Sequence, residues 1–385
     1  MISFALSDDD KGLRDMAHDF ADTRLRPSAR DCEKAGEVPA ALQQEYHDLG
    51  LDVLALPENL GGAGLGNVSL AILQEELAWG DAGILQAVPG PGLFGYLVLA
   101  TGSPEQQERF LGRYAAGLAR AAVAAGEPGP GYGGEIVETT ATPEGDGYRL
   151  RGRKRIVLGA EGADQYLVAA RTPTDGEAAM SLFVVPAGTA GLSVGSRHRT
   201  LGLEAATFSS LELDGVLVPG EALLASGITP ERLEQAMARA DLVLAAQALG
   251  VARAAVEYAS SYVVTRKAFG QLIAAFQGVS FYLADMAMQV EAARGLLWRA
   301  AWAMDRGQDT SYLLPAAVVQ AYEAALFATN GAVQLLGGHG YVQDHPVEKW
   351  MRDVRALTLL GGHRDRLTVA AGKAAAGLAT AGVMS

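Results

Sequence analysis

The order of the hydrophobic periodicities constrains this chain more than any other feature, because the periodicity changes twice along the sequence. From Ser7 to about Leu118, apolar residues recur at three- and four-residue spacing, which predicts amphipathic helices. Short β-branched or alternating runs separated by turns follow and predict closely spaced strands. Long helical patterns resume at Thr229, with Pro230 at a first helical position. The sequence therefore predicts a helical domain over 1–120, a β domain over 121–228 and a helical domain over 229–385.

The charge balance argues against a broad nucleic-acid-binding surface. The chain has 31 Lys and Arg against 44 Asp and Glu, a net charge of −13 at pH 7, and no run of five or more like charges. Neutralising a phosphate backbone requires clustered basic side chains. We therefore expect no nucleic-acid partner.

Cysteine usage and the apolar segments indicate a cytoplasmic location without membrane insertion. Cys32 is the only cysteine, so no internal disulfide can form, and neither CxxC nor HxxxH pairs suggest a metal site. The acidic N-terminus does not resemble a signal peptide. The most apolar window, 242–255, is interrupted by Gln247 and Arg253 and is shorter than the roughly 20 residues that span a bilayer. It predicts a buried helix.

A candidate ligand-binding segment lies at residues 265–277, between two predicted helices. Gly270 supplies the break, Arg266 and Gln277 could present a guanidinium and an amide to one ligand, and Phe269 supplies a flat apolar surface. Taken alone, an ordinary turn between helices explains this composition as well.

A second candidate segment, 334–341, follows a predicted long helix. It contains Gln334 and three glycines within four positions: Gly337, Gly338 and Gly340. A helix C-cap needs only one glycine. Without Cβ atoms, the additional glycines would let backbone N–H groups approach a phosphate closely.

Together these two segments make the chain resemble the acyl-CoA dehydrogenase family. Residues 56–64 resemble the family's early PE-x-x-GG-x-G loop, 126–128 its TEP turn, and 346–353 its PVE-R-x-x-RD stretch. The resemblance covers nearly the whole chain. It implies an α+β fold with an N-terminal helical domain, a middle antiparallel β-barrel and a C-terminal four-helix bundle.

The resemblance also implies a flavoprotein that desaturates an acyl-CoA thioester and is usually a homotetramer. Its cofactor would be FAD, bound at a subunit interface, and electrons would pass to an electron-transfer flavoprotein or a similar acceptor. Matched by position, the residues that would hold the adenosine and pyrophosphate side of FAD are Arg266, Phe269, Gln277, Gln334, Gly337 and Gly338. In the family, a glutamate removes the α-proton while the β-hydrogen leaves as hydride to the flavin.

The sequence departs from the family at the catalytic base. The usual glutamate position, eight residues after the RD motif, holds Gly361. The alternative base position of some members aligns with Ala240, and the adjacent Asp241 is the only carboxylate close to either position. We therefore predict Asp241 as the candidate base.

The flavin-facing part of the middle domain also differs. Gly126 stands where the TEP turn has threonine, and Tyr132 where a serine often meets the flavin phosphate. Residues 156–158, an Ile-Val-Leu triplet, replace the WIT triplet that packs on the flavin. Each lost polar contact would cost about 1 kcal/mol.

Three functional hypotheses remain open. The chain is an acyl-CoA dehydrogenase whose base is Asp241 or another group in the cleft, a base-less partner subunit of a heteromeric enzyme, or a non-catalytic scaffold that binds acyl-CoA. Residues 159–164 and 359–366 resemble the divergent branch whose steroid-degrading members form heteromers. Small residues at 82 and 87–89 are compatible with a bulky or branched acyl group, but chain length and shape cannot be read.

Overall fold

A computed structural model describes residues 6–127, 137–173, 179–360 and 364–377. The N-terminal helices begin at Asp8, and Ser7 caps the first of them by accepting a hydrogen bond from the N–H of Asp10 at 3.0 Å. The helices of this part are α1 (Asp8–Phe20), η1 (Ala21–Leu25), α2 (Arg26–Ala35), α3 (Ala40–Asp48), α4 (Asn67–Ala87), α5 (Gly92–Thr101) and α6 (Pro104–Leu111). The first part of the chain is thus helical, as predicted.

Helix α4 is kinked rather than straight. Asp81 has φ −164° and ψ 119°, which is extended backbone inside an otherwise helical run. Its Oδ1 accepts a hydrogen bond from the N–H of Ile84 at 2.8 Å, so Asp81 acts as the N-cap of the second half of α4. The kink turns the end of α4 in a new direction.

The middle of the chain forms one eight-stranded mixed sheet. Its path runs β6-β7-β3-β2-β4-β5-β8, and β1 pairs with β4 in parallel. The strands are β1 (Ala121–Ala124), β2 (Thr140–Glu144), β3 (Gly147–Leu158), β4 (Gln165–Thr172), β5 (Ala179–Pro186), β6 (Leu192–Arg197), β7 (Phe208–Pro219) and β8 (Leu223–Ile228).

This sheet corrects the prediction of a closed antiparallel barrel. The path has two ends, at β6 and β8, and no pairing between them is present among the described strands. Two pairings are parallel, those of β1 and β2 with β4. Strands with alternating apolar and polar residues predict that a sheet forms. Which strands pair depends on contacts between residues far apart in sequence, so the pattern could not predict whether the sheet closes into a barrel.

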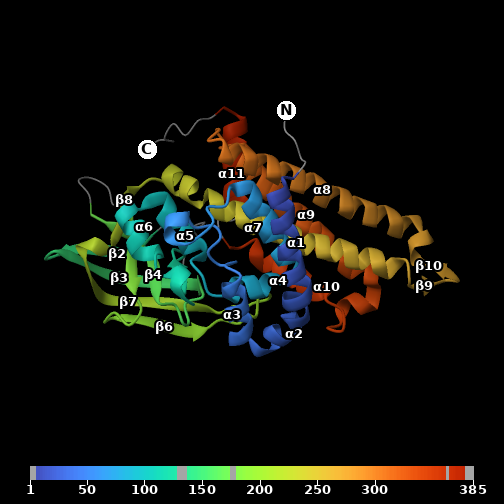
Figure 1. Cartoon of the computed structure of the whole chain (residues 1–385), viewed down its shortest axis with the longest axis horizontal. Coiled ribbons are helices and arrows are strands. Elements are labelled where there is room, and N and C mark those ends of the chain that lie inside the picture. The colour runs from blue at the N-terminus through green and yellow to red at the C-terminus, as the bar shows by residue number, and fades with distance from the viewer. Residues whose placement is uncertain (1–5, 128–136, 174–178, 361–363, 378–385) are drawn as a thin grey trace.

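The C-terminal part consists of three long helices followed by two shorter ones. Thr229 caps α7 by accepting a hydrogen bond from the N–H of Arg232. The elements are α7 (Pro230–Val263), β9 (Lys267–Ala268), β10 (Gln271–Leu272), α8 (Gln277–Asp305), α9 (Leu313–Leu336), η6 (Gly337–Tyr341), α10 (Val347–Leu357) and α11 (Arg364–Ala375). The β9–β10 hairpin lies at the end of the molecule opposite the sheet (Figure 1).

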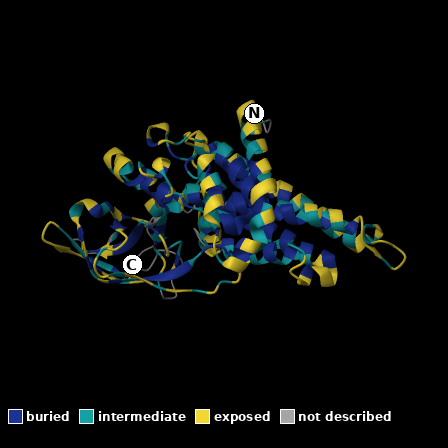
Figure 2. Ribbon diagram, turned by 60° about the horizontal axis from the view of Figure 1, so that its bottom comes forward, coloured by how far each residue is buried: buried dark blue, intermediate teal, exposed yellow. Residues whose placement is uncertain are grey.

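The core lies where α4 packs against α7 and α8 and these two helices pack against α9, and Figure 2 shows the buried residues concentrated there. The predicted buried helix at 242–255 is confirmed, because nearly all of its side chains are buried in this core. One described helix segment, Arg232–Val263, is long and apolar enough to cross a membrane, but it is mostly buried inside the protein, as core helices are.

Candidate functional site

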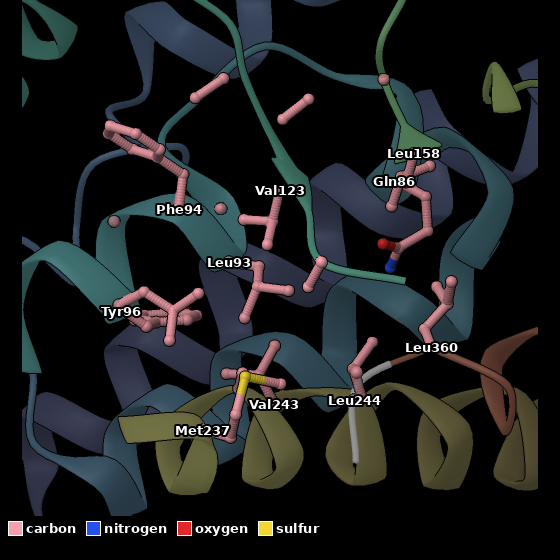
Figure 3. Close-up of a pocket in the computed structure, with 18 of the residues that line it drawn as sticks. Gln86, Leu93, Phe94, Tyr96, Val123, Leu158, Met237, Val243, Leu244 and Leu360 are labelled. Carbon is pink, nitrogen blue, oxygen red and sulfur yellow. The ribbon is translucent and has the colours of Figure 1, made fainter. Parts of the chain in front are cut away.

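The three parts of the chain enclose one large cavity of about 1370 Å³. Figure 3 shows side chains of α4, α5, the sheet and α7 directed toward it. Its wall is mainly apolar, with a few polar groups. Its lining residues include Gln74, Gln86 and Tyr96 from the N-terminal helices, Gly126, Glu127, Ile156 and Leu158 from the middle domain, and Glu234, Ala240, Leu244, Gln247, Leu360 and Arg366 from the C-terminal part.

Helix α7 supplies one wall because of its periodicity. Leu233, Met237, Ala240, Leu244 and Gln247 line the cavity and are separated alternately by four and three residues, which places them on one face of the helix. Ala240, at the alternative base position, therefore faces the cavity, but its methyl side chain cannot accept a proton.

The predicted base, Asp241, lies one residue off this face and does not line the cavity. It is buried, and its Oδ2 lies 3.4 Å from Nη2 of Arg366. Arg366 also contacts Glu234, with 3.0 Å between Nη1 and Oε1, and both of these residues do line the cavity. The ion pair with Arg366 thus connects Asp241 to the cavity wall.

Glu234 is a site residue that the sequence reasoning missed. It lies seven residues, about two helical turns, before Asp241 on α7. That spacing was a readable signal for a second carboxylate near the same place. The usual base position, Gly361, and Tyr132 lie outside the described residues.

Glu127 anchors the turn that resembles TEP. It forms a buried ion pair with Lys154 on β3, and Lys154 also donates to the carbonyl of Ala169 at 2.6 Å. Burial opposes ionisation, but hydrogen bonds from Lys154 and Thr139 outweigh it and hold the pKa of Glu127 below its usual range. The carboxylate is committed to this pair and fixes the turn beside the cavity.

Two residues of the aliphatic triplet at 156–158 border the cavity, whereas Val157 is fully buried and does not line it. Leu158 points into it, and the side chain of Ile156 lies at its mouth, about half exposed. Together with Gly126, these residues present no side-chain polar group on this part of the wall.

The six predicted FAD-binding residues lie elsewhere. All six are exposed, none lines the cavity, and they occupy the ends of α7, α8 and α9 around the β9–β10 hairpin. Phe269 is 95% exposed and has a positive φ of 51°. An aromatic ring held in the open by strained backbone is suited to contact with another molecule.

Hydrogen bonds bring the two halves of this surface together. The hydroxyl of Tyr262, near the end of α7, lies 2.9 Å from Nδ1 of His339 in η6. The hydroxyl of Tyr258 lies 2.8 Å from Nδ1 of His345. The segments around 266 and 337, which the sequence suggested as partners, are thus neighbours.

The glycine turn can accept a ligand at two of its three glycines. Gly337 has φ 58° and ψ −131°, a conformation that L-residues avoid, and no described atom lies within 4 Å of an added Cβ at Gly337 or Gly338. Gly340 differs, because a Cβ there would lie 2.2 Å from the carbonyl oxygen of Val333. Packing explains Gly340, whereas the open backbone at Gly337 and Gly338 fits close approach of a phosphate or adenosine group.

A buried ion-pair triad fixes the position of α10 beside the cavity. Nζ of Lys349 lies 2.5 Å from Oδ2 of Asp81 and 2.6 Å from Oδ2 of Asp353, and all three side chains are at most 3% exposed. Asp353 also accepts the N–H of Leu203 at 2.7 Å. The triad therefore joins α4, α10 and the middle domain.

The fold and cavity define a three-domain enzyme whose ligand site is shared by a helical, a sheet and a second helical part. The acyl-CoA dehydrogenase N-terminal, middle and C-terminal domain families match residues 7–118, 122–216 and 231–375. The chain therefore belongs to the acyl-CoA dehydrogenase family, as its motifs predicted.

Individual relatives agree with this assignment. The short-chain specific acyl-CoA dehydrogenase of Bos taurus mitochondria is 34% identical over 93% of this chain and 88% of its own length. The structure of butyryl-CoA dehydrogenase from Megasphaera elsdenii superposes with a TM-score of 0.90 at 30% identity. The superposition covers 97% of this chain and 100% of that one. A glutaryl-CoA dehydrogenase from Mycobacterium smegmatis in complex with FADH2 has a TM-score of 0.89 at 25% identity, over 98% and 97% of the two chains.

Proposed function

We propose that this chain is an FAD-dependent acyl-CoA dehydrogenase that introduces a double bond between the α- and β-carbons of an acyl-CoA thioester. One observation carries the proposal: a chain that matches the family over all three domains encloses a large, mainly apolar cavity where those domains meet. An acyl group is the kind of ligand that such a wall accepts.

FAD would be held by two sets of residues. Leu158 and Ile156 border the cavity where the flavin ring of one FAD would lie, and the open turn at Gly337 and Gly338 fits the adenosine side of a second FAD. When bound, FAD supplies the acceptor for the hydride that leaves the β-carbon.

Because the predicted adenosine-side residues lie outside the cavity, we propose that they bind the FAD of a neighbouring subunit. This arrangement requires an oligomer, for which a tetramer is the prediction from the family. A cytoplasmic location and an electron-transfer flavoprotein as acceptor complete the proposal.

The chain's own contribution to the reaction is to hold the acyl group and to remove the α-proton. Asp241 remains the predicted base, but its carboxylate is paired with Arg366 behind the wall. Glu234 lines the cavity and shares the same arginine. A base must come within hydrogen-bond reach of the proton it removes, so Glu234 is the second carboxylate to test.

Anaerobic reduction of the bound flavin by acyl-CoA tests the proposal and the base together. We expect the FAD-loaded protein to bleach on addition of acyl-CoA, and Asp241→Asn or Glu234→Gln to slow bleaching at least a hundredfold if that residue is the base. Asp214→Asn, an exposed carboxylate on β7, is the matched control and should leave the rate unchanged. Rapid reduction in both test variants would exclude both residues, and no reduction by any acyl-CoA would refute the proposed activity.

One observation favours the heteromeric alternative: the carboxylate nearest the alternative base position is engaged in an ion pair rather than directed at the cavity. In that case a related chain supplies the base, and this chain contributes part of the FAD site. The chain would then purify colourless alone and acquire flavin absorbance when coexpressed with its partner, whereas a yellow, active homomer would exclude this alternative.

A further inference from the structure

Three glutamine side chains form a hydrogen-bonded row along one wall of the cavity. Nε2 of Gln86 donates to Oε1 of Gln247 at 2.7 Å, and Nε2 of Gln247 donates to Oε1 of Gln74 at 2.7 Å. All three residues line the cavity, and Gln74 and Gln247 are buried. The kink of α4 allows two residues from the same helix to meet one residue of α7.

At one end of this row, the side-chain amide of Gln86 lies among apolar residues. Figure 3 shows its amide directed into the cavity, with Leu158, Leu244 and Leu360 around it. Its carbonyl oxygen and its second N–H make no hydrogen bond to any described residue. Amide groups in apolar surroundings are costly unless they are hydrogen-bonded, so a ligand that displaces water from this part of the cavity must offer Gln86 a partner.

The inner members hold Gln86 in place. Gln247 accepts one of its N–H groups, and Gln74 in turn accepts from Gln247, so the amide of Gln86 cannot rotate without breaking a buried hydrogen bond. The end of α4 is also fixed, because Arg120 donates to the carbonyl of Ala87 at 2.7 Å. One pair of glutamines would suffice to join α4 to α7. The third glutamine adds a positioned amide, that of Gln86, at the cavity.

The polar atoms on Gln86 specify the complementary group. One N–H donor and one carbonyl acceptor remain next to each other on the same amide. A hydroxyl group satisfies both, because it accepts and donates at one oxygen, whereas an alkyl chain satisfies neither. We propose that the acyl group bound in this cavity carries a hydroxyl group, which Gln86 recognises while Gln247 and Gln74 position its amide. This inference rests on the proposed acyl-CoA dehydrogenase function.

Binding measurements with CoA thioethers test this recognition separately from catalysis. S-hexyl-CoA and S-hexyl-CoA carrying a hydroxyl on one of the outer carbons lack the thioester carbonyl, so they are neither dehydrogenated nor lost as lactones. Titration calorimetry of the FAD-loaded protein should show at least one hydroxylated thioether binding on the order of 10- to 100-fold more tightly than S-hexyl-CoA.

Two variants and a control identify the residues responsible. Gln86→Met keeps the length of the side chain and removes its polar atoms, so the hydroxyl preference should fall to about onefold while S-hexyl-CoA binds no more weakly. Gln247→Met should reduce the preference in the same direction by freeing the amide of Gln86. Leu244→Met changes the neighbouring apolar wall and should preserve the preference.

The outcomes separate this inference from the proposed function. Equal binding of S-hexyl-CoA and every hydroxylated thioether, or a preference that persists in Gln86→Met, would overturn recognition by Gln86 and leave the dehydrogenase proposal standing. Binding of none of these CoA compounds by the FAD-loaded protein would overturn both.

Discussion

Replacing Lys349 with methionine removes the only cation of the buried triad and leaves Asp81 and Asp353 facing each other. Both carboxylates are at most 2% exposed, and each also accepts one backbone N–H. Burial opposes the charge on Lys349, but Asp353 and Asp81 outweigh it and raise its pKa above the usual value. The ammonium therefore stays charged in the native protein at all ordinary pH values.

The expected loss of stability follows from this burial. Breaking a buried pair by removing one partner costs about 3–5 kcal/mol. A chain of 385 residues has an unfolding entropy of about 0.8 kcal/mol per kelvin, so Tm should fall by about 4–6 °C. Differential scanning calorimetry at pH 8 measures this shift. Lys11→Met, which breaks the exposed pair with Asp8, is the matched control and should cost less than about 1 kcal/mol.

The pH dependence provides an independent check. Burial and the charge of Asp353 raise the pKa of Asp81, whereas Lys349 lowers it. Without Lys349 the pKa of Asp81 therefore rises further above that of the unfolded chain, and the native variant binds more protons than its unfolded state. Its stability relative to wild type must then fall as pH rises. The gap in Tm should be widest at pH 8 and narrow toward pH 5. A variant within 1 °C of wild type at pH 8 would refute the reasoning, as would a gap that widens in acid.

Three further outcomes follow from the contacts described. Gly340→Ala should lower stability by about 1–3 kcal/mol in thermal unfolding, because its Cβ would meet the carbonyl of Val333, whereas Gly338→Ala has open space and should change it by less than about 0.5 kcal/mol. Leu158→Thr adds a hydroxyl to the cavity wall and should raise FAD affinity about fivefold in a fluorescence titration, with unchanged affinity counting against a flavin ring at this position. Glu127→Gln should cost about 1–3 kcal/mol at pH 7. The native pKa of Glu127 is depressed, so the stabilisation is present above the unfolded pKa and is lost as pH falls through the native one. The difference in urea unfolding should therefore begin to shrink only below the unfolded pKa of about 4.3 and disappear once the pH lies below the native pKa.

The sequence predicted those features that depend on neighbours along the chain. The buried helix at 242–255 and the start of α7 at Pro230 are set by residues within one or two turns, and both are confirmed. Family motifs at 266–277 and 334–338 located the exposed surface around the ends of α7 and α9, although its role in FAD binding stays a prediction.

Features set by distant partners could not be predicted. The sheet stays open because β6 and β8, the two ends of the described path, do not pair with each other, and β4 has parallel partners in β1 and β2. Gln247 meets Gln74 across 173 residues, and nothing in either local pattern marks the contact. Asp241 was selected by its position next to a known base position, but the register of α7 turned it from the cavity toward Arg366, on a helix 125 residues away.

The kink at Asp81 has a consequence for the order in which the protein is made. The cation that neutralises Asp81 is Lys349, which leaves the ribosome 268 residues later. Until then, the carboxylate of Asp81 has its local hydrogen bond from Ile84 but no cation to neutralise it, so the burial of this part of α4 depends on the C-terminal part of the chain. The helix that carries Gln86 into the cavity wall is thus completed by a residue of α10.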